Sequence, residues 1–132
     1  MKEVVYVENG QSHATGPDAV KANGFIYLAA IRGVNPATGA CDTEDVGQQT
    51  RYAMENIKTA LAAAGATMDD IVRVGLFMLD MNDRRELGKV YNEYFTEGNF
   101  PVRFAVGTTG VGGGPGDLSR FTMEVIAADP NA

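Results

Sequence analysis

The segment Val74-Gly75-Leu76-Phe77-Met78-Leu79 carries no charged or polar side chain. A second segment, Phe25-Ile26-Tyr27-Leu28-Ala29-Ala30-Ile31, is almost as apolar, and neither segment alternates between apolar and polar residues. A strand with one solvated face alternates, whereas an unbroken apolar strand is typical of a sheet that is buried on both faces. These two segments therefore predict a sheet that needs cover on both sides.

The sequence around these segments predicts an α+β fold in a single domain over residues 1–132. Apolar residues at spacings of three and four predict one helix over about 42–64, capped by Asp42 or Thr43, and a second over about 83–97. Strands are expected at 4–7, 19–22, 25–31, 71–79, 102–106 and 121–128, with Asn23-Gly24 as a tight hairpin turn. The result is one mixed sheet with both helices on one face.

Two helices on one face leave the other face of the sheet without cover. A large exposed apolar surface is unusual on a monomer and is typical of a surface that binds another protein. Another subunit is the natural source of cover. The apolar pattern therefore predicts an oligomer.

Composition narrows the function classes. The chain has 11 basic and 17 acidic residues and a net charge of −6, which argues against nucleic-acid binding. No signal-peptide pattern is present, and no apolar run approaches the roughly 20 residues that span a membrane. A single cysteine cannot form an internal disulfide. We expect a cytoplasmic protein that does not bind membranes.

Few residues have the chemistry of an active site. His13 is the single histidine, so a histidine-based metal site is not expected, and Cys41 has no neighbouring histidine or lysine that would activate a thiol. The glycine-rich segment 107–116, which includes Thr108, matches neither a Walker loop nor a Rossmann fingerprint. This segment is either a mobile connection or a pocket rim whose backbone N–H groups face an anion.

Arg103 stands inside the apolar segment 100–106. It is either a solvent-facing residue on an alternating strand or a partly buried guanidinium, whose fork suits a carboxylate. Glu124 lies on the next expected strand. If the two strands are adjacent and antiparallel, Glu124 lies near Arg103, and the pair suits proton transfer on a small acidic substrate.

Two motifs of this chain are specific to one known family, the loop Asn35-Pro36-Ala37-Thr38-Gly39 and the segment Phe100-Pro101-Val102-Arg103. Further matches are Gly16-Pro17, the segment 48–65, Asp69-Asp70-Ile71-Val72, Tyr91-Asn92-Glu93-Tyr94-Phe95 and Met123-Glu124-Val125-Ile126-Ala127. On these residues the chain resembles the RidA/YjgF family of reactive-intermediate deaminases over nearly its whole length.

The resemblance implies a chorismate-mutase-like subunit in a homotrimer with three interfacial clefts. It implies that Arg103 binds a substrate carboxylate and that Glu124 places or activates water, so that these two residues are catalytic. The implied reaction hydrolyses an enamine or imine, such as 2-aminoacrylate, to a keto acid and ammonia. No metal or organic cofactor is expected.

The cleft positions that the resemblance assigns to the ligand are Arg103, Asp18, Ala29, Gly88, Ala105 and Thr108. Four of them depart from the family pattern, which has tyrosine, a Ser-Gly-Gln stretch, asparagine and cysteine where this chain has Asp18, Ala29, Gly88 and Ala105. The departures indicate a divergent subgroup with room for a larger substrate. A hydrolase of a carboxylate-bearing enamine or imine is the first hypothesis, and a non-catalytic trimer that binds a metabolite or a protein partner is the alternative.

Overall fold

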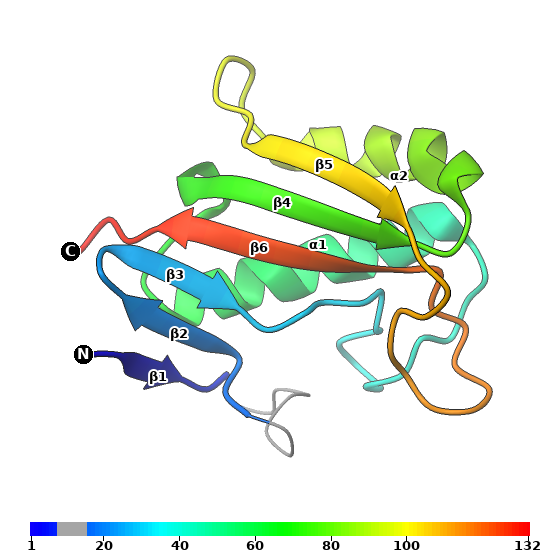
Figure 1. Ribbon diagram of the computed structural model, residues 1–132, viewed down its shortest axis with the longest axis horizontal. Coiled ribbons are helices and arrows are strands. Elements are labelled where there is room, and N and C mark those ends of the chain that lie inside the picture. The colour runs from blue at the N-terminus through cyan, green and yellow to red at the C-terminus, as the bar shows by residue number, and fades with distance from the viewer. Residues whose placement is uncertain (8–15) are drawn as a thin grey trace.

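The computed structural model describes residues 1–7 and 16–132, and these form one sheet with both helices on one of its faces (Figure 1). The main elements are β1 (Glu3–Val5), β2 (Ala19–Ala22), β3 (Phe25–Leu28), α1 (Val46–Ala63), β4 (Ile71–Met78), α2 (Arg84–Tyr91), β5 (Val102–Gly107) and β6 (Phe121–Ala128). Three short 3-10 turns are η1 (Met68–Asp70), η2 (Met81–Asp83) and η3 (Asn92–Tyr94). The predicted α+β class and the one-sided helix layer are confirmed.

The sheet has six strands in the order β1-β2-β3-β6-β4-β5. Every described pair is antiparallel except β4 with β5, which run parallel and are joined through α2. The sheet is therefore mixed, as predicted. The C-terminal strand β6 lies between β3 and β4, so β5 is an edge strand that pairs with β4 alone.

Helix α1 begins later than the sequence indicated. Its N-cap is Asp45, whose carboxylate accepts hydrogen bonds from the backbone N–H groups of Gly47 and Gln48. The predicted cap at Asp42 or Thr43 is wrong, because Thr43 instead accepts a hydrogen bond from the Asp45 N–H through its hydroxyl. The helix ends just before Gly65, as predicted.

The second helix is shorter than its apolar pattern. Regular α-helix stops at Tyr91, and the chain tightens into η3 before it turns extended at Phe95. Phe95 packs on Tyr91 with their ring centroids 4.7 Å apart. The predicted span of 83–97 is wrong at its end because the apolar spacing continues through a 3-10 turn.

Several strand ends also differ from the prediction. β1 covers Glu3–Val5 instead of 4–7, and β3 ends at Leu28, beyond which Ile31 forms an isolated bridge with Met123. β4 ends one residue earlier, at Met78, and β5 extends one residue further. The turn at Asn23-Gly24 is confirmed, since both residues have the positive φ angles that such a turn requires.

The two faces of the sheet differ in cover. On β6, Phe121, Met123, Val125 and Ala127 are buried against the helices, while the alternate residues lie on the opposite face. We call that opposite side the open face. Its exposed large apolar residues are Val4, Phe25, Tyr27, Val102 and Val106. The sequence prediction of a sheet with one uncovered apolar face is confirmed.

Alanine substitutions at Gly33 and Gly88 should change the free energy of unfolding in opposite directions. A Cβ at Gly33 would lie 2.6 Å from the backbone oxygen of Gln49 in α1, whereas a Cβ at Gly88 would meet nothing within 4 Å. We expect Gly33→Ala to lower the free energy of unfolding by about 1–3 kcal/mol, because the helix must shift. Gly88→Ala should raise it by about 0.5–1 kcal/mol, because alanine favours a helix interior. Urea unfolding at one fixed chain concentration measures both changes, and equal effects would contradict the packing at Gly33.

Candidate functional site

Arg103 lies on the edge strand β5 and points to the side of the sheet that carries the helices. It occupies the same register position as the buried Val74 of β4, and its guanidinium carbon lies 4.8 Å from the ring centroid of Tyr91 in α2. Within the described residues, the side chain of Arg103 forms no hydrogen bond and no ion pair. Its side chain is therefore an exposed cation held by an aromatic ring, with its N–H donors unpaired.

Tyr91 is the residue of this site that the sequence analysis missed. The sequence analysis placed it in the second helix and in a segment that resembles the family, without a role at the site, yet it supports the one arginine of β5. Its side chain is buried at 2% exposure, and its hydroxyl has no hydrogen-bond partner among the described residues. Burial raises the pKa of Tyr91 to about 12, although the charge of Arg103 acts in the opposite direction. A hydroxyl-bearing aromatic on an otherwise apolar helix face was the available signal.

Three other predicted ligand positions lie at the same end of the molecule. Ala105 follows Arg103 on the same side of β5, level with the buried Leu76. Gly88 lies one turn before Tyr91 on α2, with open space where a side chain would begin. Thr108 is the second residue of the glycine-rich segment, and its backbone N–H donates to the Met78 carbonyl at 2.9 Å. Gly88 therefore leaves open space on α2, one turn from the Tyr91 ring that contacts Arg103.

Glu124 does not lie beside Arg103, and the predicted adjacency of their strands is wrong. β4 separates β5 from β6 and pairs with β5 in parallel. Glu124 lies opposite Gly75 and Arg103 opposite Val74. Because adjacent residues of β4 face opposite sides, Glu124 lies on the open face and Arg103 on the helix side. One chain alone cannot bring both side chains to the same substrate atom.

On the open face, Glu124 has a different neighbour, Arg73 of β4. The closest nitrogen–oxygen distance of this ion pair is 3.9 Å, and both side chains are about half exposed. The guanidinium carbon of Arg73 also lies 5.0 Å from the ring centroid of Phe104. Sequence analysis missed Arg73 because only the strand order places it next to Glu124.

Asp18 and Ala29 form a third group, at β2 and β3 on the far side of β6 and β4 from Arg103. The Asp18 carboxylate is buried and accepts a 2.6 Å hydrogen bond from the Val7 N–H. The Ala29 N–H donates to the backbone carbonyl of Asp18 at 2.9 Å. Within one chain these two predicted ligand positions are therefore separate from Arg103.

The end of the glycine-rich segment is anchored by polar contacts. Arg32 donates to the carboxylate of Asp117 at 2.7 Å and to the hydroxyl of Ser119 at 2.9 Å. Burial opposes ionisation of Asp117, but hydrogen bonds from Ser119 and Arg32 outweigh it and hold its pKa below the ordinary value. The fully buried Gln49 donates to the Leu118 carbonyl and accepts from the Arg120 N–H. These contacts fix where the segment returns to β6.

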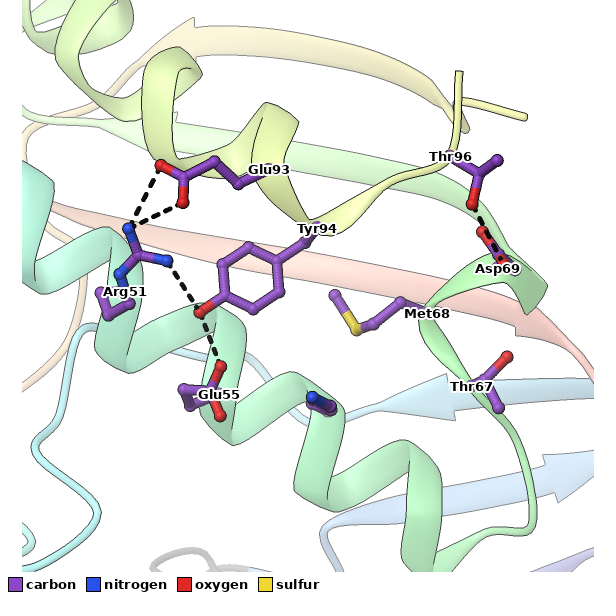
Figure 2. A pocket seen from close by; sticks show the side chains of 9 residues that line it. Arg51, Glu55, Thr67, Met68, Asp69, Glu93, Tyr94 and Thr96 are labelled. Carbon is purple, nitrogen blue, oxygen red and sulfur yellow. Dashed lines mark hydrogen bonds and ion pairs between the residues drawn. The ribbon is translucent and has the colours of Figure 1, made fainter. Parts of the chain in front are cut away.

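A groove of about 500 Å³ lies elsewhere, between α1 and the residues that follow α2 (Figure 2). Arg51 donates to both carboxylate oxygens of Glu93 at 3.0 and 3.2 Å, and the Tyr94 hydroxyl donates to Glu55 at 2.6 Å. These charged groups satisfy one another and tie α1 to η3. None of the predicted site residues lines this groove, so we do not assign the site to it.

Two further sequence predictions concern residues outside this arrangement. His13 lies outside the described residues. Cys41 is buried, and its thiol contacts the Thr43 carbonyl at 3.7 Å. Over the part of the chain that the structure describes, no cluster of three or more histidine, cysteine or acidic residues could hold a metal ion. Over the same part, no helix is both long and apolar enough to cross a membrane.

Known proteins resemble this chain in both sequence and fold. The family model described as Endoribonuclease L-PSP matches residues 12–128. A RutC family protein of Pyrococcus horikoshii is 41% identical, over 96% of this chain and 92% of that protein. The 2-iminobutanoate/2-iminopropanoate deaminase of Salmonella typhimurium is 36% identical, over 80% of this chain and 84% of that enzyme. The crystal structure of the Rid-family protein YyfA from Yersinia pestis superimposes with a TM-score of 0.87 at 30% identity, over 97% of this chain and 99% of that one. With this sequence match and this shared fold, the chain belongs to the RidA/YjgF family.

Proposed function

We propose that this protein is a hydrolase of the RidA type that deaminates an enamine or imine bearing a carboxylate. Water adds to the C=N bond in a cleft between the subunits of a homotrimer, and ammonia leaves. Arg103 anchors the carboxylate of the substrate.

The observation that carries the proposal is the unpaired charge of Arg103. An arginine held on an aromatic ring, with no acid beside it among the described residues, is prepared for an external anion. A guanidinium fork binds a planar carboxylate through two parallel hydrogen bonds. The open space at Gly88, one turn from Tyr91, suits a substrate larger than 2-aminoacrylate.

The name of one relative agrees with this chemistry. The Salmonella typhimurium relative is a deaminase of 2-iminobutanoate and 2-iminopropanoate, and both compounds combine an imine with a carboxylate. If the substrate of this chain also combines an imine with a carboxylate, Arg103 would bind that carboxylate.

The proposed reaction needs one base and no cofactor. An enamine first takes a proton on carbon and loses one from nitrogen, which gives the imine. The base removes a proton from water while the water oxygen bonds to the imine carbon, and the nitrogen is protonated. The hydroxyl of the resulting carbinolamine then gives its proton to the base, the nitrogen takes up a proton, and the C–N bond breaks as the C=O bond forms, leaving a keto acid and ammonia.

We propose that the base comes from a neighbouring subunit. Arg103 and Glu124 of one chain lie on opposite sides of the sheet. The open face that carries Glu124 also exposes large apolar residues that another subunit would cover. In a trimer, Glu124 of one subunit could reach the cleft that holds Arg103 of the next. Asp18 and Ala29 would line that cleft from the same neighbour as Glu124.

The second candidate is a trimer that binds a carboxylate metabolite or a protein partner without turnover. The observation that favours it is the replacement of polar residues of the family pattern by Ala29, Gly88 and Ala105. Ligand binding without ammonia release would support this candidate.

A trimer should be the species in solution. Sedimentation equilibrium at micromolar concentration is expected to give three times the 14.0 kDa of one chain. Val102→Glu and Tyr27→Glu should shift the mass toward one chain, because each places a charge in a buried interface. Glu97→Gln, at an exposed position, serves as the control. A wild-type mass of 14.0 kDa would show a single chain and would contradict the proposal of a cleft between subunits.

Arg103 should dominate the affinity for small carboxylates. In calorimetric titrations with 2-oxobutanoate, Arg103→Ala is expected to weaken binding by at least about a hundredfold, because a charge-assisted bidentate pair is lost. Arg103→Lys should weaken binding by about tenfold, because lysine cannot form the same fork. Arg85→Ala, which removes another exposed arginine, should leave the affinity unchanged. Equal affinities for wild type and Arg103→Ala would remove Arg103 as the anchor.

Mixed trimers can test whether the site is shared between subunits. Glu124→Gln should lower ammonia release from imines made in situ by about a hundredfold or more, the usual contribution of a general base, with little loss of affinity. Arg103→Ala should also be inactive. Refolding the two variants together should restore part of the activity, because some clefts then combine an intact Arg103 with an intact Glu124.

Two results would count against this arrangement. Undiminished ammonia release in Glu124→Gln would exclude Glu124 as the base. Two inactive variants that show no recovery after confirmed mixing would place the functional Arg103 and Glu124 on the same chain.

A further inference from the structure

The guanidinium of Arg103 sits at the end of a long side chain on an exposed strand edge. A free arginine side chain loses rotamer entropy when it is fixed in one orientation. An anchor that is already held binds its ligand without losing that entropy again. The contact that holds the Arg103 side chain therefore contributes to the affinity of the site for its carboxylate ligand.

The Tyr91 ring is the group that supplies this contact, and it is fixed in the core. Tyr91 is 2% exposed and follows the fully buried Leu87 by one turn of α2. Its ring packs on Phe95. The ring centroid of Phe95 in turn lies 5.8 Å from that of Phe100, two residues before β5 begins. The guanidinium thus lies on an aromatic cluster that joins α2 to the segment just before its own strand.

The hydroxyl of Tyr91 takes no part in this support. It is buried and has no hydrogen-bond partner in the part of the chain that the structure describes. Since burial raises the pKa of Tyr91 to about 12, the ring stays neutral at ordinary pH and does not neutralise the guanidinium as a carboxylate would. An aromatic ring is therefore a support that leaves the charge and the donors of Arg103 available to a ligand.

We infer that Tyr91 is a positioning residue whose ring holds the Arg103 guanidinium in the orientation that receives the carboxylate. This inference rests on the proposed role of Arg103 as the anchor. It assigns the ring face, and not the hydroxyl, as the functional part of Tyr91.

Two substitutions separate the ring from the hydroxyl. Tyr91→Phe keeps the ring, so its affinity for 2-oxobutanoate should stay within twofold of the wild-type value. Its melting temperature should be equal or higher, because a buried unpaired hydroxyl is removed. Tyr91→Leu removes the ring and should weaken binding about tenfold, in line with a cation–π contact at a partly desolvated site. If Tyr91→Leu does not assemble, Tyr91→Met keeps an apolar side chain of closer size and takes its place.

The mobility of the arginine gives a second readout that does not depend on the ligand. Nitrogen-15 relaxation of the Arg103 Nε–H group should report an ordered side chain in the wild type and in Tyr91→Phe. The same group should be disordered in Tyr91→Leu. A variant that merely loosened the core would alter backbone relaxation and melting temperature without selecting this one side chain.

The outcomes distinguish this inference from the proposed function. If Arg103→Ala abolishes binding while Tyr91→Leu binds as tightly as wild type, the anchor stands and the positioning role is wrong. If Tyr91→Phe binds 2-oxobutanoate as weakly as Tyr91→Leu does, the effect belongs to the hydroxyl and the role of the ring is wrong. If Arg103→Ala itself binds normally, the anchor fails, whatever Tyr91 does.

Discussion

One sheet with two apolar faces and helices on only one of them is the constraint on which the rest of this molecule depends. Both helices pack on the same side, where the alternate residues of β6 are buried. The open face keeps exposed aromatic and branched residues on strands from β1 to β5. Apolar area that stays in water adds nothing to stability, and it contributes only when another surface covers it. The proposed assembly would supply that cover and would bring a neighbouring subunit to the edges of the sheet.

The position of β6 decides how such a site is divided. Because the last strand enters between β3 and β4, the parallel strand β5 is displaced to the edge of the sheet. Arg103 then faces α2, whereas Glu124 faces outward beside Arg73. The proposed catalytic pair is thus separated within the chain, and assembly would have to reunite it. Activity would then depend on the same apolar contacts that hold the subunits together.

Arg73 of β4 and Arg103 of β5 differ in the groups that lie beside their guanidinium groups. Arg73 has both an aromatic neighbour, Phe104, and an acid, Glu124, so its charge is partly balanced within the chain. Among the residues that the structure describes, Arg103 has an aromatic neighbour, Tyr91, and no acid. An aromatic face attracts a cation without cancelling its charge, while a carboxylate both attracts and cancels it. This difference explains why Arg103, and not Arg73, is the proposed anchor for an external anion.

The sequence by itself determined the α+β class, the one-sided helices, the uncovered apolar face and the turn at Asn23-Gly24, because apolar periodicity and turn chemistry are local properties. It also marked Arg103 as unusual, since a charge inside an apolar strand is visible without coordinates. Only the tertiary structure decided the order of β5, β4 and β6, the contact between Tyr91 and Arg103, and the separation of Glu124 from Arg103. Strand order and contacts between distant elements depend on long-range packing, which no residue spacing along the chain records.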